Sequence, residues 1–439
     1  MHYTMKEAAR FIEENDVKFI RLAFCDIFGI QKNISIMPAQ LPRAFEEGVS
    51  FDACAVRGFL NVEESDLFLV PDPATLSILP WRPSQGRVVR FFCDIRRPNG
   101  TPFEGDARHI LREAQNRLHR RGYACRVGPE CEFYLLRTNE NGDPTMTPHD
   151  NAGYCDIAPL DRGENVRREI CLTLEEMGIL PESSHHEQGP GQNEIDFRYD
   201  EALPAADQLV TFKAVVKAIA AQNGLFATFL PKPFPDQSGS GLHVNLSLVK
   251  GGHNLFLTGG EPLHSQEAES FTQGILRRAA EITSFLNPLP SSYERLGAFE
   301  APRYVTWSRG NRSQLVRVPA AYGEAQRIEL RSPDPTCNPY LAFVLLMEAG
   351  MEGVDDALAL EAPTDLDLYT APAEQTAQLK RLPSSLFEAL RLTRESDFVR
   401  RVLPEAMVDN YISYKEAECR AAPRTTDAGA FGRGMDLRY

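Results

Sequence analysis

Four short segments of the chain alternate apolar and polar residues in the manner of half-buried β-strands. They span residues 128–136, 185–197, 239–248 and 327–331. Because successive strand side chains point to opposite faces, each segment has one apolar and one polar face. Three of the polar faces hold Glu130, Glu132 and Tyr134; His243, Asn245 and Ser247; and Arg327, Glu329 and Arg331. The pattern predicts a sheet packed on one side and lined with glutamates, a histidine and arginines on the other.

Between these segments, apolar residues recur at helical spacing. Helices are predicted over 107–120, 166–177, 207–222, 270–286 and 340–351, the first capped by Asp106. The first hundred residues contain one helix pattern and then apolar runs over 17–25, 66–70 and 88–93, followed by a turn-forming run at 96–100. We therefore expect an α+β protein with a small mixed-sheet domain over 1–100 and a catalytic domain over 101–439.

Composition narrows the classes of function. The chain has 439 residues, 43% of them hydrophobic, and a net charge of −14, which argues against binding to nucleic acid or to an anionic membrane surface. Its nine cysteines form no CxxC pair and are typical of reduced intracellular thiols. We see no signal peptide and no apolar run approaching about 18 residues, so we expect a cytoplasmic protein.

Five glutamates are predicted to face one cleft. A lone Glu-x-Glu is usually a solvated strand face, but the turn at Gly189–Gly191 should fold Glu187 and Glu194 back towards each other. Carboxylates gathered in this way raise one another's pKa unless cations neutralise them. Oxygen-rich ligation with one histidine favours Mg²⁺ or Mn²⁺ over zinc. The candidate ligands are Glu130, Glu132, Glu187, Glu194, His243 and Glu329.

The adjacent residues His185 and His186 are ambiguous. Neighbouring strand residues face opposite ways, so at most one of the two can point into the cleft. For both residues we favour a structural or supporting role.

Seven arginines and no lysine lie between Arg295 and Arg331, whereas an ordinary solvated surface mixes the two residue types. An all-arginine run favours planar, bidentate recognition of anions, although any one of these arginines could instead form a structural ion pair. Arginines beside Mg²⁺-type ligands fit phosphoryl transfer. Since the chain has no GxxxxGK[ST] loop, a nucleotide would be held by metals and arginines instead of a P-loop. The seven are Arg295, Arg303, Arg309, Arg312, Arg317, Arg327 and Arg331.

Together these motifs make the chain closely similar to the bacterial type I glutamine synthetases, in their alpha-like branch, over nearly its whole length. The order and number of the motifs make the resemblance very specific. They are Asn61–Leu67, Gly128–Phe133, His185–Glu187, Gly191–Glu194, Pro231–Pro233, Gly239–His243, Glu300–Pro302, Asn311–Ser313 and Arg327–Leu341.

The resemblance implies a small N-terminal β-grasp-like domain and a large catalytic domain with a curved antiparallel sheet. It implies an enzyme that uses ATP and two or three Mg²⁺ or Mn²⁺ ions to phosphorylate glutamate, after which ammonium, deprotonated at Asp52, displaces phosphate. It also implies a homo-oligomer, a dodecamer of two stacked rings, in which Asp52 reaches the active site of the neighbouring subunit.

The resemblance further assigns roles to individual residues. It implies that one metal is held by Glu130, His243 and Glu329, and the other by Glu132, Glu187 and Glu194. Glutamate would be fixed by Gly239, His243, Arg295 and Arg331, close to Glu132, and covered by a flap that carries Glu300. Ammonium would meet Asp52 and Tyr154. The nucleotide and its phosphates would contact Glu182, Asn245, Ser247, Arg312, Arg317 and Arg327.

Several positions depart from the usual family pattern. The ammonium loop is normally Phe-Asp-Gly-Ser-Ser but runs Phe51-Asp-Ala-Cys-Ala55 here, which leaves open a γ-glutamyl-amine ligase that takes a polyamine or another amine. Ser238 replaces a frequent asparagine, and Asn61 replaces an arginine used for glutamine feedback in one branch. Tyr369 is a weak candidate for adenylylation, because the insertion of the branch regulated in that way is missing. A third possibility is a catalytically silent structural or regulatory relative, which the six retained ligands disfavour.

Overall fold

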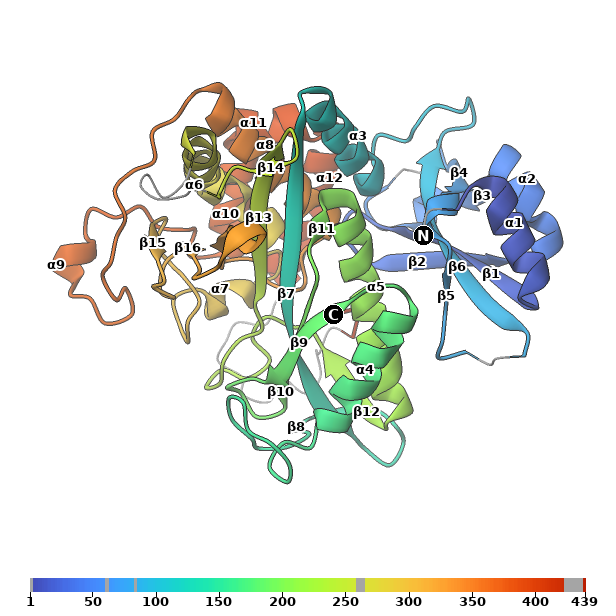
Figure 1. Cartoon of the computed structure of the whole chain (residues 1–439), viewed down its shortest axis with the longest axis horizontal. Coiled ribbons are helices and arrows are strands. Elements are labelled where there is room, and N and C mark those ends of the chain that lie inside the picture. Colours follow the sequence, from blue (N-terminus) through green and yellow to red (C-terminus); the bar gives the residue numbers. More distant parts are fainter. Residues whose placement is uncertain (1–2, 60–62, 83–84, 258–264, 422–436) are drawn as a thin grey trace.

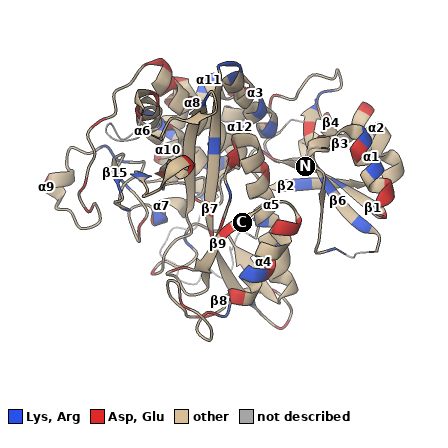
Figure 2. Cartoon of the chain, viewed as in Figure 1, with Lys and Arg blue, Asp and Glu red and all other residues tan. Residues whose placement is uncertain are grey.

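The computed structural model describes residues 3–59, 63–82, 85–257, 265–421 and 437–439. It contains two β-sheets, a smaller one built from the first hundred residues and a larger one built from the rest (Figure 1). Acidic and basic residues are interspersed over both parts in the view of Figure 2.

The smaller sheet is mixed, as the sequence predicts. Its six strands follow the order β2-β1-β6-β4-β3, with β5 also paired to β6. Strands β1 and β6 run parallel, whereas the other pairs are antiparallel. The predicted apolar runs become β1, β4 and β6. The elements of this part are α1 (Met5–Glu14), β1 (Val17–Cys25), β2 (Gln31–Ile36), α2 (Leu41–Glu46), β3 (Val49–Asp52), β4 (Asp66–Pro71), β5 (Ser77–Ile78) and β6 (Arg87–Arg96).

The larger sheet has eleven strands, and its main path is β15-β16-β17-β13-β7-β10-β9. It is antiparallel except where β15 pairs with β16. Its long central strand is β7 (Tyr123–Thr138), next to β13 (Leu242–Lys250) and β10 (Gln192–Phe197). The other strands are β8 (Pro144–Pro148), β9 (Pro181–His186), β11 (Asp200–Glu201), β12 (Leu225–Thr228), β14 (His253–Asn254), β15 (Trp307–Arg309), β16 (Val316–Val318) and β17 (Ile328–Leu330).

Helices pack against the apolar face of this sheet. Phe133 of β7 is buried, with its ring centroid 6.2 Å from Phe212 and 5.8 Å from Phe229. The helices of this larger part are α3 (Ala107–Arg120), α4 (Glu164–Glu176), α5 (Ala202–Gln222), α6 (Gln266–Leu286), α7 (Ser292–Arg295), α8 (Pro339–Asp355), α9 (Ala373–Thr376), α10 (Leu386–Glu395), α11 (Asp397–Val402) and α12 (Glu405–Ala421). The alternation therefore identified the packed face correctly.

Three predicted helix boundaries were wrong, and α10–α12 were not predicted. Helix α5 begins at Ala202, since Pro204 stands in its first turn, where no backbone donor is needed. Helix α6 begins at Gln266, because the side chain of Ser265 caps it through the Ala268 amide. Helix α8 continues to Asp355. The Asp106 cap of α3 is confirmed.

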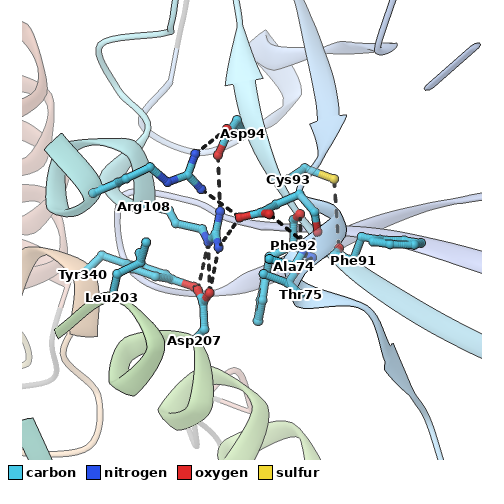
Figure 3. A network of polar contacts seen from close by, with 12 residues as sticks. Ala74, Thr75, Phe91, Phe92, Cys93, Asp94, Arg108, Leu203, Asp207 and Tyr340 are labelled. Carbon is cyan, nitrogen blue, oxygen red and sulfur yellow. Dashed lines mark hydrogen bonds and ion pairs between the residues drawn. The ribbon is translucent and has the colours of Figure 1, made fainter. Parts of the chain in front are cut away.

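An ion-pair network joins the two parts (Figure 3). Arg108 of α3 is 5% exposed and lies 2.7 Å from Asp207 of α5 and 3.0 Å from Asp72, which follows β4. It also contacts Asp94 of β6 at 3.3 Å. Burial alone would lower the pKa of Arg108, but the charge of Asp207 and its hydrogen bonds hold it well above the usual value. The network fixes the small sheet to the helices of the larger part.

Candidate active site

The larger sheet brings five of the six candidate metal ligands together, and the sixth, Glu187, directly follows β9. In the strand register Glu130 of β7 pairs with His243 of β13, and Glu132 pairs with Glu194 of β10. Glu329 of β17 is opposite Asn245, two residues along β13 from His243. Directly opposed strand residues have neighbouring side chains on the same face. Residues as far apart as 130 and 329 therefore meet.

Two groups of these side chains have spacings suited to a cation. In the first, His243 Nδ1 lies 3.5 Å from a Glu130 oxygen and 3.7 Å from a Glu329 oxygen. The donor atoms of Glu130, His243 and Glu329 all lie within 4.8 Å of one another, as do those of Glu132, Glu194 and His243. Carboxylate-rich sets with one imidazole fit Mg²⁺ or Mn²⁺ chemistry.

His185 and His186 point in opposite directions, as expected. His185 Nε2 is 2.9 Å from Glu187 and 3.9 Å from Glu194, and the three residues form a further possible cation group. His185 is thus the one of the two histidines that faces the cluster, where it contacts the candidate ligand Glu187. His186 is fully buried and bonds Asp150 at 2.9 Å, which ties the β9–β10 hairpin to the segment after β8.

The charges of the cluster are unevenly balanced. Burial would raise the pKa of Glu329, but His243 and two arginines lower it to about 2. These arginines are Arg317, at 2.6 Å, and Arg331, which makes a shorter contact. Burial and the charge of Glu187 instead raise the pKa of Glu132 to about 8. Burial and the neighbouring carboxylate thus disfavour ionised Glu132, and a divalent cation bound there would favour its ionised form.

A cavity of about 30 Å³ lies beside the second ligand group. Gly239 lies at its wall, where a Cβ would meet the Pro231 carbonyl at 2.3 Å, so the close approach requires glycine. Arg295 is 3% exposed and donates to the Ser332 carbonyl at 2.8 Å. The predicted glutamate-binding residues at this cavity are Glu132, Gly239, His243, Arg295, Glu300 and Arg331.

A second cavity of about 130 Å³ lies on the Glu130 side of the cluster. Arg327 Nε donates to Asn245 at 2.8 Å there. The predicted nucleotide residues that line it are Glu182, Asn245, Ser247 and Arg327. Asp196 and Tyr199 line it as well and were missed, although Asp196 alternates with Glu194 on the same strand face.

The remaining predicted residues lie outside both cavities. Arg317 pairs with Glu329, Arg312 is exposed, and its carbonyl accepts a bond from Arg331 Nε at 3.0 Å. Tyr154 is 58% exposed, and its ring lies 5.3 Å from the His185 ring at the edge of the ligand cluster. For Arg317 the structure therefore shows the structural ion pair that the sequence left open as an alternative to anion binding.

Asp52 lies in the small sheet, away from the strands that hold the cluster. It ends β3 in the small sheet, on the other side of α3 and α5 from β9 and β10 (Figure 1). Its carboxylate accepts a hydrogen bond from the Cys54 amide at 2.9 Å and is exposed.

Two other positions were singled out in the sequence as possible sites of regulation. Asn61 lies outside the described residues, and Tyr369 donates to the Arg312 carbonyl at 3.2 Å.

Comparison with known families gives matches over nearly all of the chain. Residues 16–98 match the family described as glutamine synthetase, beta-Grasp domain, and residues 104–431 match glutamine synthetase, catalytic domain. A glutamine synthetase of Clostridium saccharobutylicum is 45% identical over 420 residues, covering 95% of each chain. One from Methanosarcina mazei is 44% identical over 419 residues, 94% of each chain.

Solved structures share the fold. An apo GmaS structure aligns with a TM-score of 0.86 and 31% identity over 94% of this chain and 95% of its own. A glutamine synthetase of Plasmodium falciparum, solved by cryo-electron microscopy, aligns with a TM-score of 0.86 at 24% identity, over 97% of this chain and 98% of its own. The predicted pairing of a β-grasp-like domain with a larger catalytic domain is confirmed. Among the described residues, no helix is long and apolar enough to cross a bilayer.

Proposed function

The chain belongs to the glutamine synthetase family, and we propose that it is an ATP-dependent glutamate–ammonia ligase that works through γ-glutamyl phosphate. The observation that carries this proposal is the position of the carboxylate cluster. One ligand group borders the cavity that holds Arg295 and Glu300, and the other borders the cavity that holds Arg327 and Ser247. A phosphoryl donor and an acidic acceptor can therefore meet across the cluster.

We propose that two or three Mg²⁺ or Mn²⁺ ions are held by Glu130, His243 and Glu329 on one side and by Glu132, Glu187 and Glu194 on the other. Such ions would supply Lewis acidity and neutralise the charge of the phosphate oxygens. The oxygen-rich donor set, with one imidazole, supports the choice of Mg²⁺ or Mn²⁺.

The residues of the chain position and protect the reactants. Arg295 and Arg331 would hold the glutamate carboxylates, while Arg312, Arg317 and Arg327 would contact phosphates. A γ-carboxylate oxygen of glutamate attacks the γ-phosphorus of ATP, and ADP leaves with the bonding electron pair. Glu300 would cover the cavity and exclude water from the acyl phosphate.

Ammonium would complete the reaction. It gives a proton to Asp52, and the resulting ammonia attacks the acyl carbon as the carbon–oxygen bond breaks and its electron pair leaves with phosphate. The new amide nitrogen then gives its surplus proton to the departing phosphate. Tyr154 would accept a hydrogen bond from ammonium at the rim. Since Asp52 lies in the small sheet of its own chain, away from the cluster, we propose a cytoplasmic homo-oligomer, a dodecamer, in which residues 1–100 complete the site formed by residues 101–439 of the next subunit.

Release of phosphate from ATP and glutamate, compared with ammonium, hydroxylamine, putrescine and ethanolamine as acceptors, tests this function. We expect ammonium to give the highest kcat/KM. A γ-glutamyl-amine ligase is the rival, motivated by the Ala53-Cys-Ala55 loop, but the curated relatives do not favour it. An amine whose kcat/KM is at least about tenfold above that of ammonium would show that the protein is a γ-glutamyl-amine ligase. This tenfold ratio corresponds to roughly 1.4 kcal/mol.

A further inference from the structure

Gln188 connects the β9–β10 hairpin to the segment that closes the glutamate cavity. It lies in the hairpin turn, and its Nε2 donates to Glu300 Oε1 at 3.1 Å. Its Oε1 accepts from Ser238 Oγ, before β13, at 3.4 Å. All three side chains line the cavity of about 30 Å³. One neutral side chain thus bridges three separate segments at the mouth of the cavity.

The segment that carries Glu300 has a backbone that needs such support. Phe299 and Glu300 have φ values of +46° and +62°, in the left-handed region that residues with a Cβ rarely adopt. A conformation of this kind persists only when surrounding contacts impose it. The segment is not held by its own secondary structure, because it falls between α7 and β15.

Backbone and side-chain contacts hold this segment in place. Within it, Gly297 N donates to the Ala301 carbonyl at 3.0 Å, and Ala301 N donates to the Ala298 carbonyl at 3.2 Å. Arg331 Nη2 donates to the Glu300 carbonyl at 3.3 Å and lies 3.7 Å from its carboxylate. Lys232 Nζ sits 4.2 Å from the centre of the Phe299 ring. Arg331 is shared with Glu329, whereas the amide of Gln188 is bonded to Glu300 and Ser238 and comes from the opposite wall of the cavity.

We propose that Gln188 is a positioning residue that latches Glu300 across the glutamate cavity and keeps water out while the acyl phosphate awaits ammonia. The inference rests on the proposed function and adds a residue to it. Latching acts through Glu300, so Gln188 is not required to touch the reacting atoms. Closure of this kind protects an intermediate that water would otherwise consume.

Failure of the latch has a defined chemical consequence. A water oxygen attacks the acyl carbon of γ-glutamyl phosphate, the carbon–oxygen bond to phosphate breaks, and its electron pair leaves with phosphate. Glutamate is regenerated and one proton is released. The net reaction is hydrolysis of ATP to ADP and phosphate without glutamine.

Two substitutions separate the latch from its surroundings. Gln188→Met keeps the length of the side chain but removes the side-chain donor to Glu300. The backbone N–H of residue 188, which donates to the Glu187 carboxylate at 3.0 Å, is kept. Gln188→Glu places a like charge next to the Glu300 carboxylate. Gln273→Met is the matched control, because Gln273 also donates to a glutamate, Glu361, at 3.4 Å on the far helix α6.

The experiment measures two quantities on the full assembled protein. The first is phosphate released without ammonium, divided by glutamine formed with ammonium. The second is hydrogen–deuterium exchange of the peptide covering residues 296–304 in the absence of substrates. For Gln188→Met we expect the ratio to rise on the order of tenfold, as for loss of one hydrogen bond to a charged group, and exchange to accelerate. Gln188→Glu should raise the phosphate-to-glutamine ratio further than Gln188→Met does. Gln273→Met should have the same ratio and the same exchange rate as the wild type.

The outcomes are distinguishable. A wild type that makes no glutamine overturns the proposed function, whatever the exchange data show. A wild type that makes glutamine, together with a Gln188→Met protein whose phosphate-to-glutamine ratio is unchanged, overturns the latch. An unchanged ratio overturns the latch even if exchange increases. The hydrogen bond from Gln188 to Glu300 would then hold the segment in place without excluding water.

Discussion

Replacing Arg108 by methionine should destabilise the small sheet. We expect a larger loss of stability than removal of any surface ion pair would cause. The substitution leaves Asp72, Asp94 and Asp207 close together, and Arg112 then pairs with the first two. Breaking a buried ion pair typically costs 3–5 kcal/mol. Because these carboxylates retain some exposure, we take the lower end, about 3 kcal/mol, which is roughly a 150-fold change in an equilibrium constant.

Native-state hydrogen exchange measures this effect. The amides of Val89–Phe92 on β6 exchange when the small sheet unfolds, and that unfolding also breaks the Asp72 and Asp94 contacts. In Arg108→Met we expect their exchange to accelerate by roughly 150-fold. In Arg108→Lys the exchange rate should lie between those of Arg108→Met and the wild type. One ammonium group cannot replace a planar guanidinium that contacts three carboxylates.

A matched control lies in the same part of the molecule. Arg43 of α2 pairs with Glu47 at 2.9 Å, but both side chains are largely exposed. Arg43→Met should accelerate exchange no more than about fivefold, since surface pairs contribute about 0–1 kcal/mol. If Arg108→Met accelerates exchange less than about tenfold, the inference that this network fixes the small sheet to the larger part is wrong.

Three further predictions concern the site. Glu329→Gln should abolish glutamine formation and weaken Mn²⁺ binding measured by calorimetry, and it should also lower the melting temperature, because Arg317 and Arg331 lose a buried carboxylate partner; near-normal activity would refute the ligand assignment. A mixture of inactive Asp52→Ala and Glu329→Gln chains should regain partial activity on reassembly, and an active monomer by light scattering would count against shared sites. Ala55→Ser should lower the ammonium KM about fivefold, the effect of one neutral hydrogen bond, and steady-state kinetics showing a rise instead would place residue 55 outside the ammonium pocket.

The sequence alone determined the features that depend on local chemistry. Alternation along β7, β13 and β17 gave the packed and polar faces, because side-chain direction in a strand follows residue parity. The turn at Gly189–Gly191 and the Asp106 cap were likewise readable, since each uses hydrogen bonds between near neighbours. Helix starts failed where a cap or a first-turn proline competed with the apolar pattern, as at Ser265 and Pro204.

Only the tertiary structure decided which charges meet. Periodicity placed Arg331 and Glu329 on one face, but packing made the arginines partners of the cluster's own carboxylates. The choice between His185 and His186, and the bond from Gln188 to Glu300 across 112 residues, also required the folded chain. Arg108 and Asp207 are 99 residues apart, and nothing in either local sequence specifies their pairing. Contacts of this kind depend on how whole elements pack, which residue spacing along the chain does not encode.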